Sequence, residues 1–231
     1  FQGWHKPKSF DRNLVVIGAG AAGLVSSYIA ATVKAKVTLV EANKMGGDCL
    51  NYGCVPSKAI IRSAKLAQHM RDGHKYGLNS TQPDFSFRSV MQRVQNIIKQ
   101  IEPHDSVERY TKLGVEVLEG YATIIDPWTV EIKLHDGQIQ KLTTRSIIIA
   151  TGAEPVVPDL PGIDDVDYVT SDTVWQKFAE LDVVPKRLVI LGGGPIGCEL
   201  SQAFARLGSE VTQIERSDRL MNREDKDVSE L

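Results

Sequence analysis

Two closely spaced cysteines are the residues of this chain with the clearest chemical potential. Cys49 and Cys54 lie five positions apart in a glycine-rich stretch that runs on to Lys58. Because five positions exceed one helical turn, the two sulfurs can meet only if the first turn is distorted, and the neighbouring glycines permit that. A close pair at a helix start, where partial positive charge favours a thiolate, suits reversible dithiol chemistry.

A structural role for the pair is the alternative. A disulfide that closes so small a ring would stabilise the fold by only about 2 kcal/mol on the loop-entropy formula. Only one other cysteine, Cys198, occurs in the chain, and nothing suggests secretion. These observations favour redox chemistry over a structural disulfide or two buried thiols, although the spacing alone leaves both open.

The composition is that of an ordinary globular protein. With 231 residues, 42% hydrophobic content and a formal net charge of −2, the chain can form one large or two modest domains. The absence of a basic block and an aromatic content of 6% argue against nucleic-acid binding. Apolar runs are strand-sized and too short to cross a bilayer, so we expect a cytoplasmic protein. Residues 1–12 are set aside as a tag remnant and leader.

A dinucleotide-binding unit is predicted near the N-terminus. An unbroken β-branched run at 14–17 leads into a G-x-G-x-x-G motif and an apolar helical stretch, and a second strand at 36–40 ends on Glu41. Glycines in such a turn let the backbone approach a pyrophosphate at the helix start, and an acid after the second strand accepts hydrogen bonds from a ribose. The glycines of the motif are Gly18, Gly20 and Gly23.

The same pattern recurs near the C-terminus. A strand at 188–191 precedes a second glycine motif and a helix, and a strand at 210–214 leads to Glu215. Glu41 and Glu215 each follow the first glycine of their motif by 23 positions. The repeat predicts two dinucleotide sites on one chain. The second motif contributes Gly192, Gly194 and Gly197.

Between the two units the pattern changes from helices to strands. Helical spacing at 60–70 and 87–113 is interrupted at Pro103, which predicts a kink or two helices. A proline-rich segment then predicts a domain boundary, followed by a short helix capped by Ser171 or Asp172. Strand patterns are seen at 115–118, 122–125, 129–134, 138–142 and 147–150.

Together these motifs resemble the flavin-dependent pyridine nucleotide–disulfide oxidoreductases, and the cysteine stretch is most similar to mercuric-reductase-like members. The resemblance covers the chain from about residue 13 to its end. It implies an α/β fold of two Rossmann-like units. Residues 13–157 would form an FAD-binding domain with three-layer ββα character and the redox dithiol, and 158–231 an NAD(P)-binding domain incomplete at its C-terminus.

The resemblance also implies residue roles. Cys54 would be the thiol against the flavin and Cys49 the outer thiol that attacks substrate. Lys58 would lie near the flavin and pair with Glu199, although an exposed acid early in a helix is the alternative for Glu199. The implied FAD contacts are Gly18, Gly20, Gly23, Glu41, Gly47, Asp48, Ala122, Ala150, Thr151 and Gly152, and the implied nicotinamide contacts are Gly192, Gly194, Gly197 and Glu215.

On this resemblance the parent protein passes electrons from NAD(P)H through FAD to a Cys49–Cys54 disulfide, and then to a small-molecule disulfide, a dithiol or Hg(II). No resident metal is implied. Glu215 favours NADH over NADPH because a carboxylate repels the 2′-phosphate, while Arg216 and Arg219 are the competing signal. The alternative is a non-catalytic flavin- or nucleotide-binding module that senses redox state or mediates an interaction.

Two departures from the family pattern stand out. Pro195 occupies a position where many relatives carry an aromatic gate over the flavin. The chain ends inside the second domain, whereas relatives continue into a dimerisation domain with a His–Glu pair. We therefore expect a homodimer in the full-length parent, and weak FAD binding without turnover in the 231-residue chain.

Overall fold

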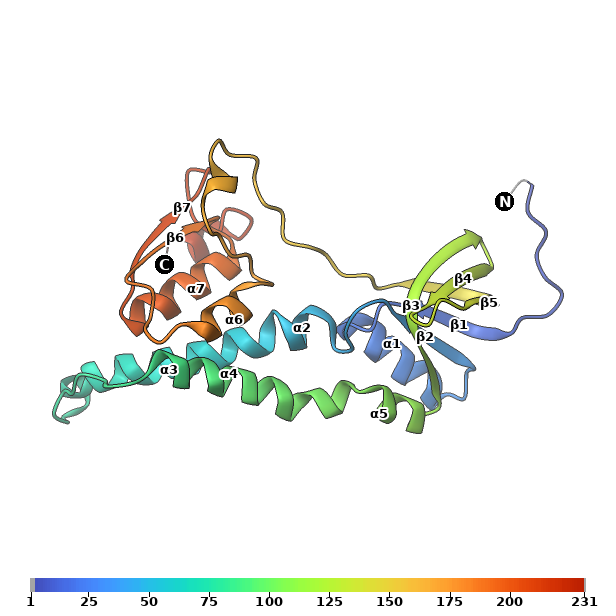
Figure 1. Ribbon diagram of the computed structural model, residues 1–231, viewed down its shortest axis with the longest axis horizontal. Coiled ribbons are helices and arrows are strands. Elements are labelled where there is room, and N and C mark those ends of the chain that lie inside the picture. The colour runs from blue at the N-terminus through green and yellow to red at the C-terminus, as the bar shows by residue number, and fades with distance from the viewer. Residues whose placement is uncertain (1–2, 231) are drawn as a thin grey trace. The chain divides into compact units, whose positions relative to one another are not determined.

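The computed structural model describes residues 3–230, which form two compact units (Figure 1). Unit 1 contains the chain up to Asn51 together with Ile98–Val156, and unit 2 contains Tyr52–Ile97 together with the chain from Val157. Each unit is therefore assembled from two separate segments. The predicted division into 13–157 and 158–231 concerns which cofactor each part binds, and it stays a prediction.

A parallel sheet forms the centre of unit 1. Strand β1 (Arg12–Ile17) pairs with β2 (Val37–Glu41) on one side and with β5 (Ile139–Ile149) on the other, and β2 pairs with β3 (Val115–Asp126). Helix α1 (Ala21–Thr32) connects β1 to β2 and lies beside this sheet (Figure 1). Both predicted strands and the helix between them are confirmed.

The same strands continue into an antiparallel meander that includes β4 (Thr129–Leu134). The first part of β3 pairs with β2 and its second part with β4, while β5 pairs first with β4 and then with β1. The five strands thereby close into a barrel. The prediction that β3 and β5 are each two strands is wrong, because each passes from one ladder to the next without interruption.

Successive side chains along β1 and β2 point to opposite faces of the parallel sheet, so a hydrophobic core forms on each face. Val16 and Leu39 belong to the cluster that includes α1 residues, whereas Val15 and Val40 belong to the cluster that includes the meander. All four side chains are at most 1% exposed. The result is a helix layer, a parallel sheet and a meander, which confirms the expected α/β architecture.

The helical segment breaks where Pro103 predicted. Helix α4 (Phe87–Ile101) is followed by a 3₁₀ turn and then by α5 (Val107–Lys112), whose cap, Ser106, accepts a hydrogen bond from the Arg109 amide. The cysteine stretch contains helix α2 (Gly47–Asn51) and the start of α3 (Cys54–Arg71). The 3₁₀ turns are Gly73–Tyr76, Glu102–Asp105, Ile163–Asp165 and Phe178–Glu180.

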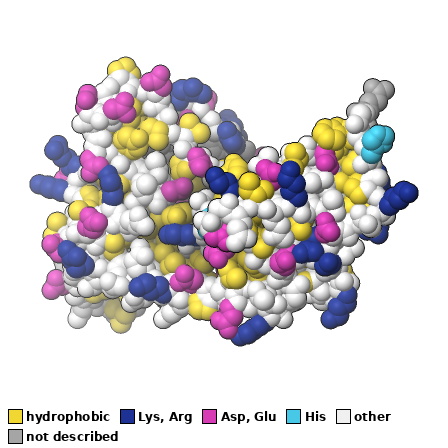
Figure 2. Space-filling model, turned by 45° about the vertical axis from the view of Figure 1, so that its right-hand side comes forward, with side chains coloured by type: hydrophobic (Ala, Val, Ile, Leu, Met, Phe, Trp, Pro, Cys, Tyr) yellow, Lys and Arg dark blue, Asp and Glu magenta, His cyan; other side chains and the backbone are white. Residues whose placement is uncertain are grey.

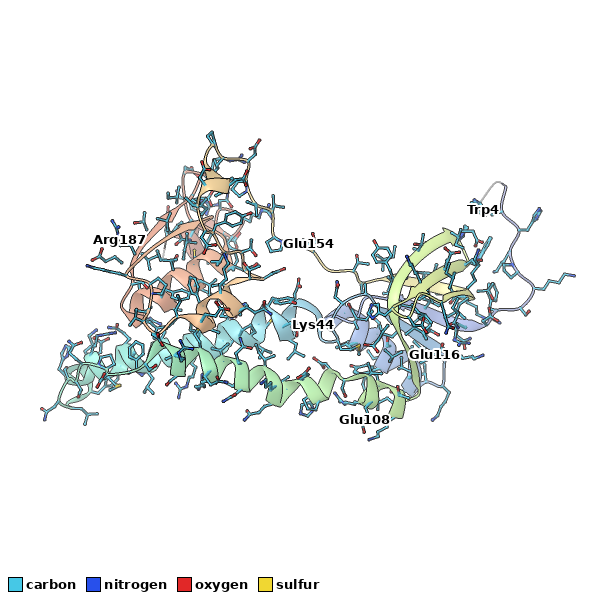
Figure 3. The ribbon with its side chains drawn as sticks, in the orientation of Figure 1. Trp4, Lys44, Glu108, Glu116, Glu154 and Arg187 are labelled. Atoms are coloured by element: carbon cyan, nitrogen blue, oxygen red, sulfur yellow. The ribbon has the colours of Figure 1, made fainter. Side chains whose placement is uncertain are left out.

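Unit 2 contains the second nucleotide-binding pattern. Strands β6 (Arg187–Leu191) and β7 (Glu210–Ile214) are parallel and are connected by helix α7 (Pro195–Leu207), as predicted. Arg187 marks the start of β6 in Figure 3. The short helix α8 (Lys226–Ser229) was not predicted.

Three phenylalanines from different segments pack against one another in unit 2. Phe87 of α4, Phe178 and Phe204 of α7 form a cluster with ring centroids 5.5–6.5 Å apart. Phe178 follows α6 (Val174–Lys177), whose N-cap is Thr173. The prediction of Ser171 or Asp172 as the cap is therefore wrong. The Thr173 hydroxyl accepts a hydrogen bond from the Thr170 amide and gives no side-chain cap to the helix.

The proline-rich segment has no regular secondary structure from 150 to 160; Glu154 marks it in Figure 3. The chain passes from unit 1 to unit 2 within it, after Val156. On the face shown in Figure 2, acidic and basic side chains are interspersed. Among the residues that the structure describes, no helix is long and apolar enough to cross a membrane. The predicted tag remnant falls largely on residues 1–2, outside the described part.

Gly120 is the point where β3 changes partners, and it offers a test of the barrel. A Cβ at this buried position would overlap the Lys133 carbonyl oxygen and lie 2.8 Å from Leu134 Cα, both backbone atoms of β4. Gly120→Ala should therefore destabilise the chain by about 1–3 kcal/mol in urea unfolding, because β4 must move away. Thr123→Ala on the exposed face of β3 is the control and should cost less than about 1 kcal/mol. Equal costs would show that β4 moves freely.

Candidate functional site

The first glycine motif forms a tight turn between β1 and α1. Gly18 has a φ of +102°, and a Cβ there would overlap the carbonyl oxygen of Ala150. A Cβ at Gly23 would overlap the carbonyl oxygen of Gly18, so both positions require glycine for close packing of helix on strand. Gly20 is the N-cap of α1 and supplies no side-chain cap, and the first turn holds no acidic residue. The first amides of the helix therefore have no capping side chain from Gly20 and no acid in the first turn.

Glu41 closes this turn from the end of β2. Its carboxylate accepts hydrogen bonds from the backbone amides of Ala19 at 2.6 Å and Asn43 at 2.7 Å. The acid is thus held at the carboxyl end of the strand, against the glycine turn. This position agrees with the place predicted for it.

The second motif repeats this geometry in unit 2. Gly192 has a φ of +112°, and a Cβ at Gly197 would overlap the Gly192 carbonyl oxygen. Glu215 accepts hydrogen bonds from the Gly193 amide at 2.6 Å and the Ser217 amide at 2.8 Å. The two glycine motifs, which have the same spacing in the sequence, therefore have the same backbone geometry and the same type of hydrogen bond to an acid. An added Cβ at Gly194 would meet nothing within 4 Å, so this part of the turn is open.

The start of the cysteine stretch packs against the first turn. The Gly46 amide donates a 2.9 Å hydrogen bond to the carbonyl of Ala19. Gly47 has a φ of +54°, and a Cβ there would lie 2.6 Å from Gly20 Cα. Asn51, which the sequence did not single out, donates through Nδ2 to the carbonyls of Met45 and Gly47. In the sequence, only its polar side chain close to the glycine-rich stretch could have indicated that Asn51 bonds to the backbone.

The remaining predicted FAD contacts all lie in unit 1. Asp48 is an exposed acid in the first turn of α2, and a Cβ added to Gly152 would come within 3.9 Å of its carboxylate. The Ala150 amide donates to the Ile17 carbonyl at the end of β1. Ala122 packs against the meander cluster. Thr151 is exposed in the segment after β5.

The two cysteines lie in consecutive helices. Cys49 is half-buried in α2, and Cys54 is the exposed first residue of α3; both are thiols in the structure. The expected distortion is a break between the helices at Tyr52 and Gly53. Exposure gives no support to the order that the resemblance implied, with Cys54 inner and Cys49 outer, so that order stays a prediction.

An ion pair in unit 2 joins two of the predicted site residues. Lys58 Nζ lies 2.6 and 2.5 Å from the two carboxylate oxygens of Glu199, as the resemblance predicted. Lys58 follows Cys54 by four positions, so both lie on one face of α3. The side chains are 60% and 43% exposed, and a pair so open to solvent stabilises a fold by about 0–1 kcal/mol. Folding stability is therefore a weak reason for this pair.

Comparison with known proteins places this geometry in a family. The family model for pyridine nucleotide-disulphide oxidoreductases matches residues 12–231. The chain belongs to this family.

Relatives in the pyridine nucleotide-disulphide oxidoreductase family include enzymes with different substrates. Mercuric reductase from Bacillus cereus is 33% identical over 222 residues, covering 96% of this chain and 34% of the relative. Dihydrolipoyl dehydrogenase from Mycoplasma genitalium is 34% identical over 223 residues, covering 96% and 47%. The chain thus spans roughly a third to a half of the length of these relatives.

A solved structure of a flavoprotein shares the fold. It is the Cu(II) complex of a mutant HOCl-induced flavoprotein disulfide reductase from Escherichia coli, with a TM-score of 0.76 and 29% identity. The match covers 95% of this chain and 45% of that one. The α/β fold expected from the sequence is therefore confirmed.

The acid of the second turn gives the family member a testable pH dependence. Hydrogen bonds from the amides of Ser217 and Gly193 lower the pKa of Glu215 from its ordinary 4.5. Because the folded pKa lies below the unfolded one, the stabilisation is complete above the ordinary value and is lost as pH falls through the folded value.

Glu215→Gln should therefore lower the urea midpoint at about pH 7, and its difference from wild type should shrink as pH falls below about 4. The measurement is urea unfolding followed at several pH values. Glu210→Gln, an exposed acid at the start of β7, controls for the loss of one charge. A difference between Glu215→Gln and wild type that stays constant down to about pH 3 would contradict the role of these hydrogen bonds.

Proposed function

We propose that the protein carrying this chain is a flavin-dependent oxidoreductase that passes electrons from a nicotinamide through FAD to a Cys49–Cys54 dithiol, and then to substrate. One observation carries the proposal: the Lys58–Glu199 pair joins α3, which begins at Cys54, to α7, which begins at the second glycine turn. The helix that carries Cys54 and the helix proposed to bind a nucleotide are thereby linked within unit 2.

The first glycine turn fits FAD. Backbone amides at the start of α1 suit a pyrophosphate, and Gly20, the N-cap of the helix, brings no side chain over them. The Glu41 carboxylate is held by two amides and keeps further lone pairs for a ribose hydroxyl. Asp48, Ala122, Ala150, Thr151 and Gly152 would complete the site, as the resemblance implies.

The second glycine turn fits a nicotinamide dinucleotide. Gly192, Gly194 and Gly197 give the backbone access that a pyrophosphate needs, and Glu215 lies where a ribose 2′-hydroxyl would bind. Arg219, which would favour the 2′-phosphate of NADPH, donates through Nη2 to the carbonyls of Asn222 and Glu224, each at 3.2 Å. Its Nη1 is buried, and no partner for it is found in the described part of the chain. The fixed carboxylate supports NADH.

The dithiol would perform the chemistry on substrate. FAD, when bound, would supply a two-electron carrier between the nicotinamide and the protein disulfide. Two electrons and two protons break the Cys49–Cys54 bond and give two thiols. The Cys49 thiolate then attacks a substrate disulfide, forms a mixed disulfide and releases one thiol. Cys54 attacks the Cys49 sulfur, releases the second thiol and restores the protein disulfide.

Two substrate classes suit this site. Relatives named mercuric reductase and dihydrolipoyl dehydrogenase are similarly distant, at 33% and 34% identity. Thiolates bind soft ions such as Hg(II) and also exchange with disulfides. A disulfide, a dithiol or Hg(II) is therefore the proposed substrate class, and a homodimer in the cytoplasm, without nucleic-acid partners, is proposed on the resemblance alone.

Serine variants of the two cysteines test the electron path. In the intact FAD-loaded protein, Cys49→Ser and Cys54→Ser should each reduce NADH-dependent disulfide reduction by about a thousandfold or more, because one sulfur cannot re-form the protein disulfide. NADH oxidation with ferricyanide as acceptor is the control, and should survive because it needs neither sulfur.

Mass spectrometry of trapped adducts then distinguishes the two cysteines. Reduced Cys54→Ser protein should form a stable mixed disulfide on Cys49 with the substrate. If only Cys49→Ser traps substrate, the two roles are reversed. If both variants keep full disulfide reduction, the Cys49–Cys54 pair is structural and the electrons reach substrate by another route.

Coenzyme preference tests the assignment of Glu215. The intact protein should show a higher kcat/KM with NADH than with NADPH. Glu215→Gln should lower kcat/KM for NADH by about ten- to hundredfold, since a hydrogen bond to a charged group contributes roughly 1.5–3 kcal/mol. Glu210→Gln is the matched control. A preference for NADPH that Arg219→Met abolishes would instead assign the site to the 2′-phosphate.

A further inference from the structure

A buried tryptophan holds the chain just before Cys54. Trp175 in α6 is 3% exposed, and its indole Nε1–H donates a 2.6 Å hydrogen bond to the carbonyl oxygen of Tyr52. Tyr52 is followed by Gly53, the N-cap of α3, and then by Cys54 at the first helical position. A residue 123 positions away therefore fixes the peptide two residues before the thiol.

The tryptophan is itself held in place. Its carbonyl accepts a 3.3 Å hydrogen bond from Gln95 Nε2 of α4. One turn further on, Phe178 packs against Phe87 and Phe204. The indole N–H is thus presented by a packed part of unit 2. A donor fixed in this way positions its partner more tightly than an exposed side chain could.

The chain between the two cysteines is also fixed on its other side. Asn51 donates through Nδ2 to the carbonyls of Met45 and Gly47, both in unit 1. Asn51 and Tyr52 are adjacent residues, and each takes part in side-chain hydrogen bonds within its own unit. The peptide bond between them lies within the ring that a Cys49–Cys54 disulfide would close.

We propose that Trp175 is a positioning residue of the dithiol. By holding the Tyr52 carbonyl, it pre-shapes the turn between α2 and α3 and so lowers the entropy cost of closing the Cys49–Cys54 ring. Without the indole N–H, the turn between α2 and α3 is more mobile in the reduced protein, and formation of the disulfide is less favourable. The inference rests on the proposed redox role of the pair.

The test is the thiol–disulfide equilibrium of the purified 231-residue chain. In mixtures of reduced and oxidised dithiothreitol, the two protein thiols lose two electrons and two protons to oxidised dithiothreitol, which becomes the dithiol. Differential alkylation and mass spectrometry measure the oxidised fraction of Cys49 and Cys54, while Cys198 reports non-specific oxidation. This readout needs neither bound FAD nor turnover.

Trp175→Phe keeps a buried aromatic ring but removes the donor together with part of the indole. It should lower the equilibrium constant for disulfide formation by about fivefold, the value of one ordinary hydrogen bond. Trp4→Phe, the same exchange at an exposed position, is the matched control and should leave the constant unchanged. An unchanged or increased constant in Trp175→Phe, or an equal decrease in Trp4→Phe, overturns the proposal.

A second pair of variants covers the case in which Trp175→Phe does not fold. Gln95→Ala removes the hydrogen bond to the Trp175 carbonyl from a half-buried position, and Gln92→Ala removes an exposed glutamine from the same helix. Only Gln95→Ala should lower the constant; equal constants for the two count against the proposal. A wild-type chain that forms no reversible Cys49–Cys54 disulfide defeats the proposed function itself, whereas a normal wild type with unaffected variants defeats only the role of Trp175.

Discussion

The contact of a helix start with the strand that precedes it is the constraint on which both units depend. At Gly23 and Gly197 a single methyl group would overlap a carbonyl oxygen of the preceding turn, so the backbone itself must pack there. In each unit one carboxylate, Glu41 or Glu215, accepts a hydrogen bond from a backbone amide of the turn, that of Ala19 or Gly193. Strand, helix and acid are therefore fixed together, which leaves each turn suited to a phosphate ligand.

The second of these turns is linked through α7 to the helix that begins at Cys54. Helix α7 starts at the glycines and carries Glu199 toward Lys58, one turn after Cys54 on α3. Because the pair is exposed, its contribution to folding is small.

Local patterns predicted most of the elements, and long-range contacts account for what they missed. The strands and the glycine turns have short-range signatures, and β4 and β7 begin and end where the pattern said. The continuity of β3 through Gly120 depends on a change of partner strand, which no local alternation encodes. In the candidate site, the ion pair came from the family resemblance, whereas Trp175 bonds to a carbonyl 123 positions away and left no signal near the cysteines.

The interleaving of the two units has a consequence for biosynthesis. Residues 52–97 leave the ribosome long before the segment from Val157 onward, with which they form unit 2. During that interval Phe87 of α4 lacks its contact with Phe204, and the Tyr52 carbonyl lacks its hydrogen bond from Trp175, so the segment that carries Cys54 is not yet held by its partners. Its thiol is then open to oxidants and to mispairing, and a reducing surrounding or a holding chaperone would protect it until synthesis of the second segment is complete.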